Sequence, residues 1–525
     1  IGDVLCAPIT STEADNWKYL KNDYLIVTVW DIIDKVFKMI NRPIMTIKEV
    51  LNNIDENVWK LFDNGLTCTL NQVDGQWATE LLTKFKPRTL EELAMFVASI
   101  RPSFESLRDD FIDRKPYSTG SKYLDELFKN TYNRCVFQEN IMKYFEWLGV
   151  TPAESIGLIK KISKKKIHKE DFDKLEERLK EHWKENTGSY NGFDESWADM
   201  QSNMSYSFNS PHGLATALDC LYCAYLKANY PVEYYTVVFN LYSDDGNKSE
   251  RLTNECKYFN IKIESPVFRH STSEYSCDTT NKIIYKGIGS IKNIGEACGN
   301  NLYTLKDKIY SNFTELLFDV FTNKFAQKNE IEKLIKIDFF REFGDINYLL
   351  NNFNIFESLH KRKTLKSSEL DVFGITLEDI KSYVEKVTEK TISGINMPNV
   401  IDMICNKIPY EPITNIERIA YEMGILGYTD RIDNTIPDNI YVVGNIETNK
   451  YGTKFATLYH PIDGTYCQKK INKYSYNEHP CDSGDIIKVV FNIQSKRRQV
   501  DGEWIKIEEQ EEILKDYSII KKFNK

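Results

Sequence analysis

Residues 206–235 read YSFNSPHGLATALDCLYCAYLKANYPVEYY, and the rest of the chain is organised around this stretch. A polar loop ends at His212, and the apolar run that follows stops at Pro231, which cannot continue a helix. Apolar residues recur in this run with the i, i+3, i+4 spacing of one buried helical face: Leu214, Ala217, Leu218, Leu221, Ala224 and Tyr225. The stretch predicts a long core helix with one histidine at its amino-terminal end.

The composition describes a large protein with several domains. A length of 525 residues predicts three or four domains, and 42% hydrophobic residues are enough to build their cores. A net charge of −9 argues against a generally basic coat protein for nucleic acid but permits a local basic patch. No apolar run is long enough to span a membrane, and the first residues lack the layout of a signal peptide. A chain that begins at Ile1 is expected to be a fragment or one part of something larger.

The eleven cysteines are irregularly spaced and odd in number, as expected for reduced thiols in a cytoplasmic protein. Cys220 and Cys223 form the one tight pair, inside the predicted helix. Because no second pair with this spacing exists to complete a zinc site, we favour two core or partner-facing thiols over a metal or redox role.

Two segments have the composition of phosphate-binding surfaces. Residues 160–169 are rich in lysine, and they form either a solvated basic face or a surface for phosphate groups. Residues 285–296 predict a strand end, a glycine turn, a short helix, a tight hairpin and a second helix. Backbone amides at such a hairpin can bind a DNA phosphate without reading sequence.

The carboxy-terminal half contains two further signals. Residues 364–375 predict an exposed linker whose apolar tip is either a docking peptide or a segment that re-enters the core. Residues 376–435 return to a helical pattern, whereas residues 436–510 contain about five short strands separated by turns. Strands of this number and length predict a small barrel of the OB type, a fold that can bind a single strand.

Eight segments, in order along the chain, resemble motifs of the bacterial replicative DNA polymerases of the C family, the DNA polymerase III alpha subunit and its relatives. These segments are KNDYL at 21–25, Gln72, the KP and RP pairs at 86–87 and 101–102, FIDRK at 111–115, TYN and FQENIM at 131–133 and 137–142, LIKK at 158–161, YSFNSPH at 206–212 and YLKANYP at 225–231. No single motif decides the assignment, but eight in register make it specific.

The resemblance implies a multidomain α+β architecture that is mostly helical and ends in an OB-type barrel. Its parts would be the end of the palm at 1–35, the fingers at 36–245, a duplex-binding module at 246–365 with a helix-hairpin-helix near 285–300, a clamp-peptide linker and helical segment at 366–435, and the OB fold at 436–525.

The resemblance also implies roles for individual residues. Nucleotidyl transfer in this family uses two Mg²⁺ ions, for which Asp23 would be a ligand with Lys21 beside it as a phosphate partner. The incoming dNTP would contact Lys160, Lys161, Asn209 and His212, although His212 could instead be a buried structural residue. Primer–template DNA would contact Gly287, Gly289, Lys292, Gly295, Lys469 and Lys470. A sliding clamp would bind Leu370, Asp371, Val372 and Phe373.

Several departures from the family pattern limit these expectations. The P-D-x-D-x-D motif that carries the first two palm carboxylates is absent from the sequence, so an upstream part or a second subunit is expected to supply them. Asn133 and Asn293 stand where the family has glycine, and asparagine tolerates the left-handed region better than most residues. Ser210 stands in place of a lysine, which weakens the expected nucleotide contact.

The sequence therefore predicts the carboxy-terminal part of a DNA-directed DNA polymerase, from a bacterial cell or a phage-infected host, that is inactive alone. The alternatives are a non-catalytic module that binds DNA and a clamp, and a structural helical protein whose basic patches are only solvated faces.

Overall fold

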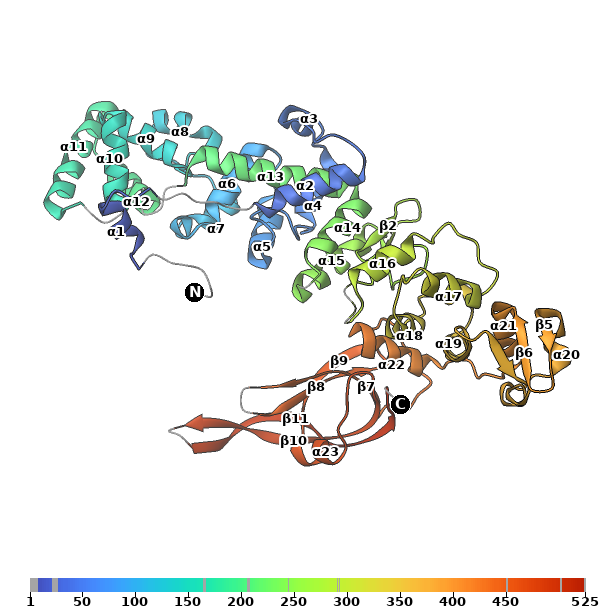
Figure 1. The fold of residues 1–525 in the computed structure, drawn as a ribbon. Helices are drawn as coiled ribbons and strands as arrows, with labels where there is room; N and C mark the ends of the chain where they lie inside the picture. The colour runs from blue at the N-terminus through green and yellow to red at the C-terminus, as the bar shows by residue number, and fades with distance from the viewer. Residues whose placement is uncertain are drawn as a thin grey trace. The chain divides into compact units, whose positions relative to one another are not determined.

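The computed structural model describes residues 8–20, 27–163, 167–204, 208–243, 245–289, 291, 293–449, 452–500 and 503–523. The chain divides into two compact units, Ile1–Phe259 (unit 1) and Asn260–Lys525 (unit 2) (Figure 1). No helix in the described part of the chain is long and apolar enough to cross a membrane.

Unit 1 is built from helices. They are α1 (Ser11–Asn16), α2 (Thr28–Met39), α3 (Ile47–Asn52), α4 (Glu56–Asp63), α5 (Gln76–Phe85), α6 (Leu90–Ser99), α7 (Arg108–Ile112), α8 (Lys122–Leu127), α9 (Gln138–Trp147), α10 (Pro152–Ser163), α11 (Lys169–Thr187), α12 (Phe193–Met204), α13 (Ser210–Asn229), α14 (Pro231–Leu241) and α15 (Gly246–Tyr258). The described part of residues 36–245, predicted to form helical fingers, contains helices joined by loops and no β-strand.

Helix α13 confirms the long core helix predicted from residues 206–235, and it packs against α2, α4 and α6. Pro231 ends the run as predicted and begins α14 at its first position. Ala217, Leu221, Ala224 and Tyr225 are buried, whereas Leu214 and Leu218 are half-buried. The second half of α13 is buried on all sides, because every residue from Cys220 to Lys227 is buried. Cys220 and Cys223 are free thiols in this buried segment.

A buried ion pair joins α13 to α15. Lys227 is fully buried and pairs with the carboxylate of Glu255, which is 7% exposed. The Lys227 Nζ also donates hydrogen bonds of 2.9 Å to the carbonyls of Leu66 and Cys68, and Glu255 accepts from the Cys68 amide at 2.9 Å and the Tyr235 hydroxyl at 2.8 Å. These contacts place α15 in unit 1, which ends at Phe259.

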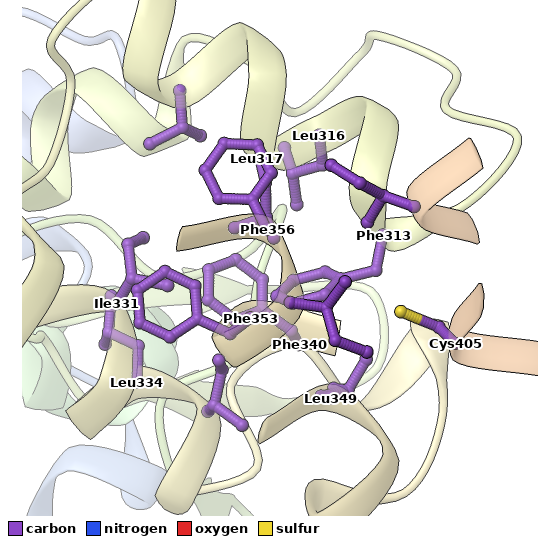
Figure 2. Close-up of a cluster of buried hydrophobic side chains, with 14 of the residues drawn as sticks. Phe313, Leu316, Leu317, Ile331, Leu334, Phe340, Leu349, Phe353, Phe356 and Cys405 are labelled. Atoms are coloured by element: carbon purple, nitrogen blue, oxygen red, sulfur yellow. The ribbon is translucent and has the colours of Figure 1, made fainter. Parts of the chain in front are cut away.

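Unit 2 begins with a small sheet and a group of helices. The sheet has the order β1-β3-β2, from β1 (Lys262–Glu264), β2 (Ser276–Asp278) and β3 (Ile283–Tyr285). The helices are α16 (Glu296–Tyr303), α17 (Phe313–Thr322), α18 (Lys328–Lys336) and α19 (Ile346–Leu359). Their apolar faces share one core, in which phenylalanines such as Phe313, Phe340 and Phe356 lie together (Figure 2).

The segment expected to be an exposed linker is instead folded. Its strand β4 (Thr364–Lys366) belongs to a three-stranded antiparallel sheet in the order β4-β6-β5. The other two strands, β5 (Val384–Val387) and β6 (Thr391–Ile395), lie in the segment 376–435, for which a helical pattern was expected. Helices α20 (Leu377–Ile380), α21 (Met397–Lys407) and α22 (Asn415–Leu426) complete this region. Leu365, Ile380 and Ile392 enter the unit 2 core, and this burial holds the short strands in place.

The last part of the chain confirms the predicted OB-type barrel. Its strands are β7 (Ile440–Thr448), β8 (Lys454–His460), β9 (Thr465–Ile471), β10 (Ile486–Val500) and β11 (Glu503–Lys521), with α23 (Lys473–Glu478) between β9 and β10. They close in the order β10-β11-β9-β8-β7, with β9 and β11 parallel and β10 paired with β7. The five-stranded closure is that of an OB fold. β10 and β11 continue past the barrel as a two-stranded ribbon (Figure 1).

Candidate nucleotide and DNA interface

The amino-terminal end of α13 is held in place by hydrogen bonds to neighbouring segments. The Asn209 side chain caps the helix by accepting from the His212 amide at 3.3 Å. The Phe208 carbonyl accepts from the Gln138 amide at 2.8 Å, and the Ser210 amide donates to the Glu139 carboxylate at 2.9 Å. The loop before α13 is therefore fixed to the start of α9.

The His212 side chain is exposed, which excludes the buried structural role considered for it. Its ring lies 5.3 Å from the Phe208 ring, centroid to centroid. Gly213 makes this arrangement possible, because a Cβ at that position would lie 3.1 Å from the Phe208 ring and 3.3 Å from the Phe137 ring. Asn209 and His212, both predicted nucleotide contacts, therefore share the start of one helix.

The Arg101 side chain also lies near the Phe208 ring. Its guanidinium is 5.2 Å from the Phe208 ring centroid, and Nη2 donates to the Gln72 side chain at 2.8 Å. Its Nε is buried and has no hydrogen-bond partner among the described residues. Such an orphaned donor is costly unless a ligand or water accepts from it. We call Gln72, Arg101, Phe208, Asn209 and His212 the α13 site.

Arg108 holds the backbone of Arg101 in place. It donates through Nε to the Ser99 carbonyl and through Nη2 to the Arg101 carbonyl, both at 2.9 Å. Its guanidinium lies 4.8 Å from the Trp77 ring. In the sequence, Arg101 was noted only as part of the motif at 101–102. The signal that could have marked it as a candidate site residue is its position directly before Pro102, just after a helix that ends at Ser99.

The predicted lysine contacts lie on a different helix. Lys160 and Lys161 are exposed in the last turn of α10, a helix that packs on α9 and α12 through buried residues such as Ile159. Lys21 and Asp23 lie outside the described residues.

The predicted DNA-binding hairpin follows β3. Of the two predicted short helices, α16 lies within the described residues, and residues 286–289 and 291 of the segment before it are described as turn or irregular structure. The glycines serve close backbone contacts: a Cβ at Gly287 would lie 2.4 Å from the Ser273 carbonyl oxygen. The Gly289 amide donates to that carbonyl at 2.9 Å, and the Gly295 amide donates to Glu330 at 3.0 Å.

Asparagine replaces glycine in two turns without disturbing them. Asn133 and Asn293 both have a φ of 62°, in the left-handed region that asparagine tolerates. Lys292, the remaining predicted contact of the hairpin, lies outside the described residues.

Lys286, at the base of the hairpin, packs on a tyrosine of the segment before the barrel. Its Nζ lies 3.5 Å from the centroid of the Tyr428 ring. Burial lowers the pKa of Lys286 to about 8, while the nearby Asp430 and Glu422 act in the opposite direction.

The two predicted lysines of the barrel are already paired within the chain. Lys469 and Lys470 on β9 pair with Glu512 and Glu511 on β11, at 2.5 Å and 3.3 Å. DNA would therefore have to compete with two carboxylates for these ammonium groups.

The predicted clamp peptide is not an exposed tip. Leu370 is 6% exposed and belongs to the unit 2 core, and Phe373 is half-buried against that core. Asp371 and Val372 are exposed, Val372 to 80%. Leu370 and Phe373, but not Val372, pack on the core, which was the other alternative considered for this segment.

The described residues do not form the implied two-Mg²⁺ site. Within them, no group of three or more histidines, cysteines, aspartates or glutamates could hold a metal ion.

Comparisons with known proteins show what the chain is similar to. A family model described as the bacterial DNA polymerase III alpha subunit finger domain matches residues 30–187, and one for a helix-hairpin-helix motif matches residues 260–347. The DNA polymerase III subunit alpha of Aquifex aeolicus is 28% identical over 382 residues, which are 69% of this chain and 32% of that protein.

Two further relatives carry the same name. That of Campylobacter jejuni is 27% identical over 431 residues, or 78% of this chain and 33% of the relative. That of Ureaplasma parvum is 28% identical over 356 residues, or 64% of this chain and 36% of the relative. The chain spans about a third of the length of these relatives. Over the regions that these matches cover, the chain is similar to the bacterial DNA polymerase III alpha subunit.

Proposed function

We propose that this chain supplies the fingers, the duplex-binding module and the OB barrel of a DNA-directed DNA polymerase. Unit 1 would bind the incoming dNTP, and unit 2 would bind primer–template DNA. Asp23 would be one carboxylate of the Mg²⁺ site, with Lys21 beside it, and an upstream part or a second subunit would supply the others. The matches to polymerase relatives along unit 1 and the hairpin region support this proposal.

The observation that carries the nucleotide proposal is the buried, unpartnered Nε of Arg101 beside an exposed histidine. Arginine is suited to phosphate because its planar guanidinium donates in a fixed fork. Arg101 and His212 both lie near the Phe208 ring. A triphosphate accepting from Arg101 would satisfy its orphaned donor, and the start of α13 adds a favourable dipole. Lys160 and Lys161 would add positive charge from α10.

Replacing Arg101 with Gln should lower kcat/KM for dNTP about 10- to 100-fold in the complete polymerase. This range follows from the loss of a charge-assisted hydrogen bond worth about 1.5–3 kcal/mol. Steady-state primer extension would measure it. Arg178→Gln is the matched control, because Arg178 on α11 forms an exposed ion pair with Glu154 on α10. Equal kcat/KM for the two variants would refute the α13 site.

For unit 2 we propose backbone-directed binding of duplex DNA by the hairpin around Gly287, Gly289, Lys292 and Gly295. Lys469 and Lys470 on the barrel would contact a single strand after exchanging their carboxylate partners for phosphates. The match of residues 260–347 to a helix-hairpin-helix motif supports the first part of this proposal.

Clamp binding by residues 370–373 is proposed from the sequence resemblance. Because Leu370 is buried, a clamp would contact the exposed Asp371 and Val372 first and would gain Leu370 and Phe373 only if the segment left the core.

Replacing Val372 with Glu should weaken clamp binding without unfolding unit 2, since this side chain is mostly exposed. Affinity for the purified clamp and processivity in primer extension would test this expectation. Leu377→Glu, at another exposed apolar residue nearby in the sequence, is the control. Unchanged affinity and processivity would make the segment an ordinary part of the fold.

A further inference from the structure

A small polar cavity lies within unit 1 and is lined by residues of α9, α12 and the segment 117–135. Its volume is about 10 Å³. No described residue of the α13 site lines it, so it is separate from the proposed nucleotide site. Its polar lining comes from segments far apart in the sequence and includes Tyr117, Thr119, Arg134, Tyr144, Ser196 and Asp199.

Arg134 brings an unsatisfied hydrogen-bond donor to this cavity. The residue is only 4% exposed, and its Nε is buried with no hydrogen-bond partner among the described residues. Nη1 donates to the Lys115 carbonyl at 3.3 Å, and the guanidinium lies 4.7 Å from the centroid of the Tyr117 ring. Burial lowers the pKa of Arg134, while nearby groups that include Asp110 and Asp199 act in the opposite direction. A buried donor without an acceptor is costly, so Nε requires a partner that the described residues do not supply.

The same cavity contains an acceptor and a second donor. The Tyr117 hydroxyl donates to Asp199 Oδ2 at 2.5 Å, and Oδ1 of that carboxylate accepts from no described residue. The Ser196 hydroxyl donates to the Tyr144 hydroxyl at 3.3 Å, and the Tyr144 hydroxyl in turn donates to no described residue. Burial raises the pKa of Tyr144, and the nearby Asp199 carboxylate adds to this shift. Asp199 is therefore close enough to both Arg134 and Tyr144 to act on them electrostatically.

We propose that this cavity binds one water molecule, which accepts from Arg134 Nε and the Tyr144 hydroxyl and donates to Asp199. The volume is about the smallest that holds a single water, and three hydrogen bonds are the usual number for a buried one. A halide ion is larger than water and would be repelled by the Asp199 carboxylate. A metal cation would be repelled by Arg134. Water is small, uncharged, and both a donor and an acceptor, so it meets all of these requirements.

The bound water joins the segment before α9 to α12, because Arg134 lies in that segment and Asp199 lies on α12. Helix α12 also packs against the short helix η1 (Pro102–Phe104), which directly follows Arg101. Loss of the water is therefore expected to loosen α12 first, in the part of unit 1 that adjoins the α13 site.

A high-resolution crystal structure of the intact chain tests the proposal. We expect one water peak at about 2.7–3.2 Å from both Arg134 Nε and an oxygen of Asp199. Arg134→Met keeps the length of the side chain but removes its donors, so this variant should lose the peak. Peptides that span α12 should then exchange their amide hydrogens about tenfold faster. Arg178→Gln, at an exposed arginine on α11, is the control and should change neither the peak nor the exchange.

Three outcomes would overturn the proposal. They are a cavity without a solvent peak in the unsubstituted chain, a peak that persists in Arg134→Met, and an anomalous signal at the peak in crystals grown in bromide, which would identify an anion. The first and third need no variant, so they decide the question even if Arg134→Met does not fold. Arg101→Gln should leave the peak unchanged, so failure of this site and failure of the nucleotide site can be told apart.

Discussion

Replacing Lys227 with Met should lower the free energy of unfolding of unit 1 by about 3–5 kcal/mol, the range observed when one partner of a buried ion pair is removed. The substitution leaves the carboxylate of Glu255 buried without its cation. It also removes the ammonium that donates to the carbonyls of Leu66 and Cys68. These two hydrogen bonds hold the loop between α4 and α5 against α13. The loss is therefore expected to spread from α15 to this loop.

Denaturant unfolding, monitored by hydrogen exchange in peptides from unit 1, would measure this change in the free energy of unfolding. The matched control is Lys257→Met, because Lys257 is exposed on the same helix as Glu255 and its ammonium donates to the side chain of Asn254 on that helix. Glu255→Gln should also be destabilising, since Gln cannot balance the buried ammonium. A loss below 1 kcal/mol for Lys227→Met would mean that the pair does not hold unit 1 together.

Replacing Asp23 with Asn should abolish primer extension by the complete polymerase while leaving duplex binding nearly unchanged. The amide keeps the size of the side chain but removes the charge that a two-metal site requires. Asp23 lies outside the described residues, so this expectation rests on the resemblance of residues 21–25 to the palm motif.

The measurement is single-turnover extension of a labelled primer beside a filter-binding assay with the same duplex. Asp31→Asn is the control, because Asp31 is exposed on α2 beside Lys35 and has no proposed catalytic role. Persistent extension by the Asp23→Asn enzyme would show that the motif is misaligned. Loss of duplex binding would show a structural role instead.

The sequence predicted those parts of the fold whose signals are local and repeated. Helix α13 followed from regular apolar spacing and from Pro231, and the barrel followed from alternating strands separated by glycine turns. The turn at Asn293 was anticipated because the left-handed preference of asparagine is a property of the residue itself.

The missed features depend on contacts between distant segments. The sheet of β4, β5 and β6 has strands of three to five residues, too short to show a period, and it is stabilised by Leu365 and Ile392 in a core built mainly by other helices. The same core buries Leu370. Lys227 was noted only as a motif residue, because its partner Glu255 lies on another helix.

In the candidate site, too, residues with a local sequence signal were predictable and residues positioned by contacts between distant segments were not. Asn209 and His212 were predictable because a helix start has a sequence signature. The position of Arg101 beside Phe208 could not be predicted, because the two residues come from different segments that only the packing of unit 1 brings together.

Photolabelling with an azido-dATP tests the central claim most directly. The complete polymerase would be held on primer–template DNA, irradiated, digested and analysed by mass spectrometry. We predict an adduct in the peptides that contain Arg101 or residues 208–213, which unlabelled dATP prevents and Arg101→Gln strongly reduces. An adduct confined to unit 2, or labelling that neither dATP nor Arg101→Gln changes, would contradict a nucleotide site at the start of α13.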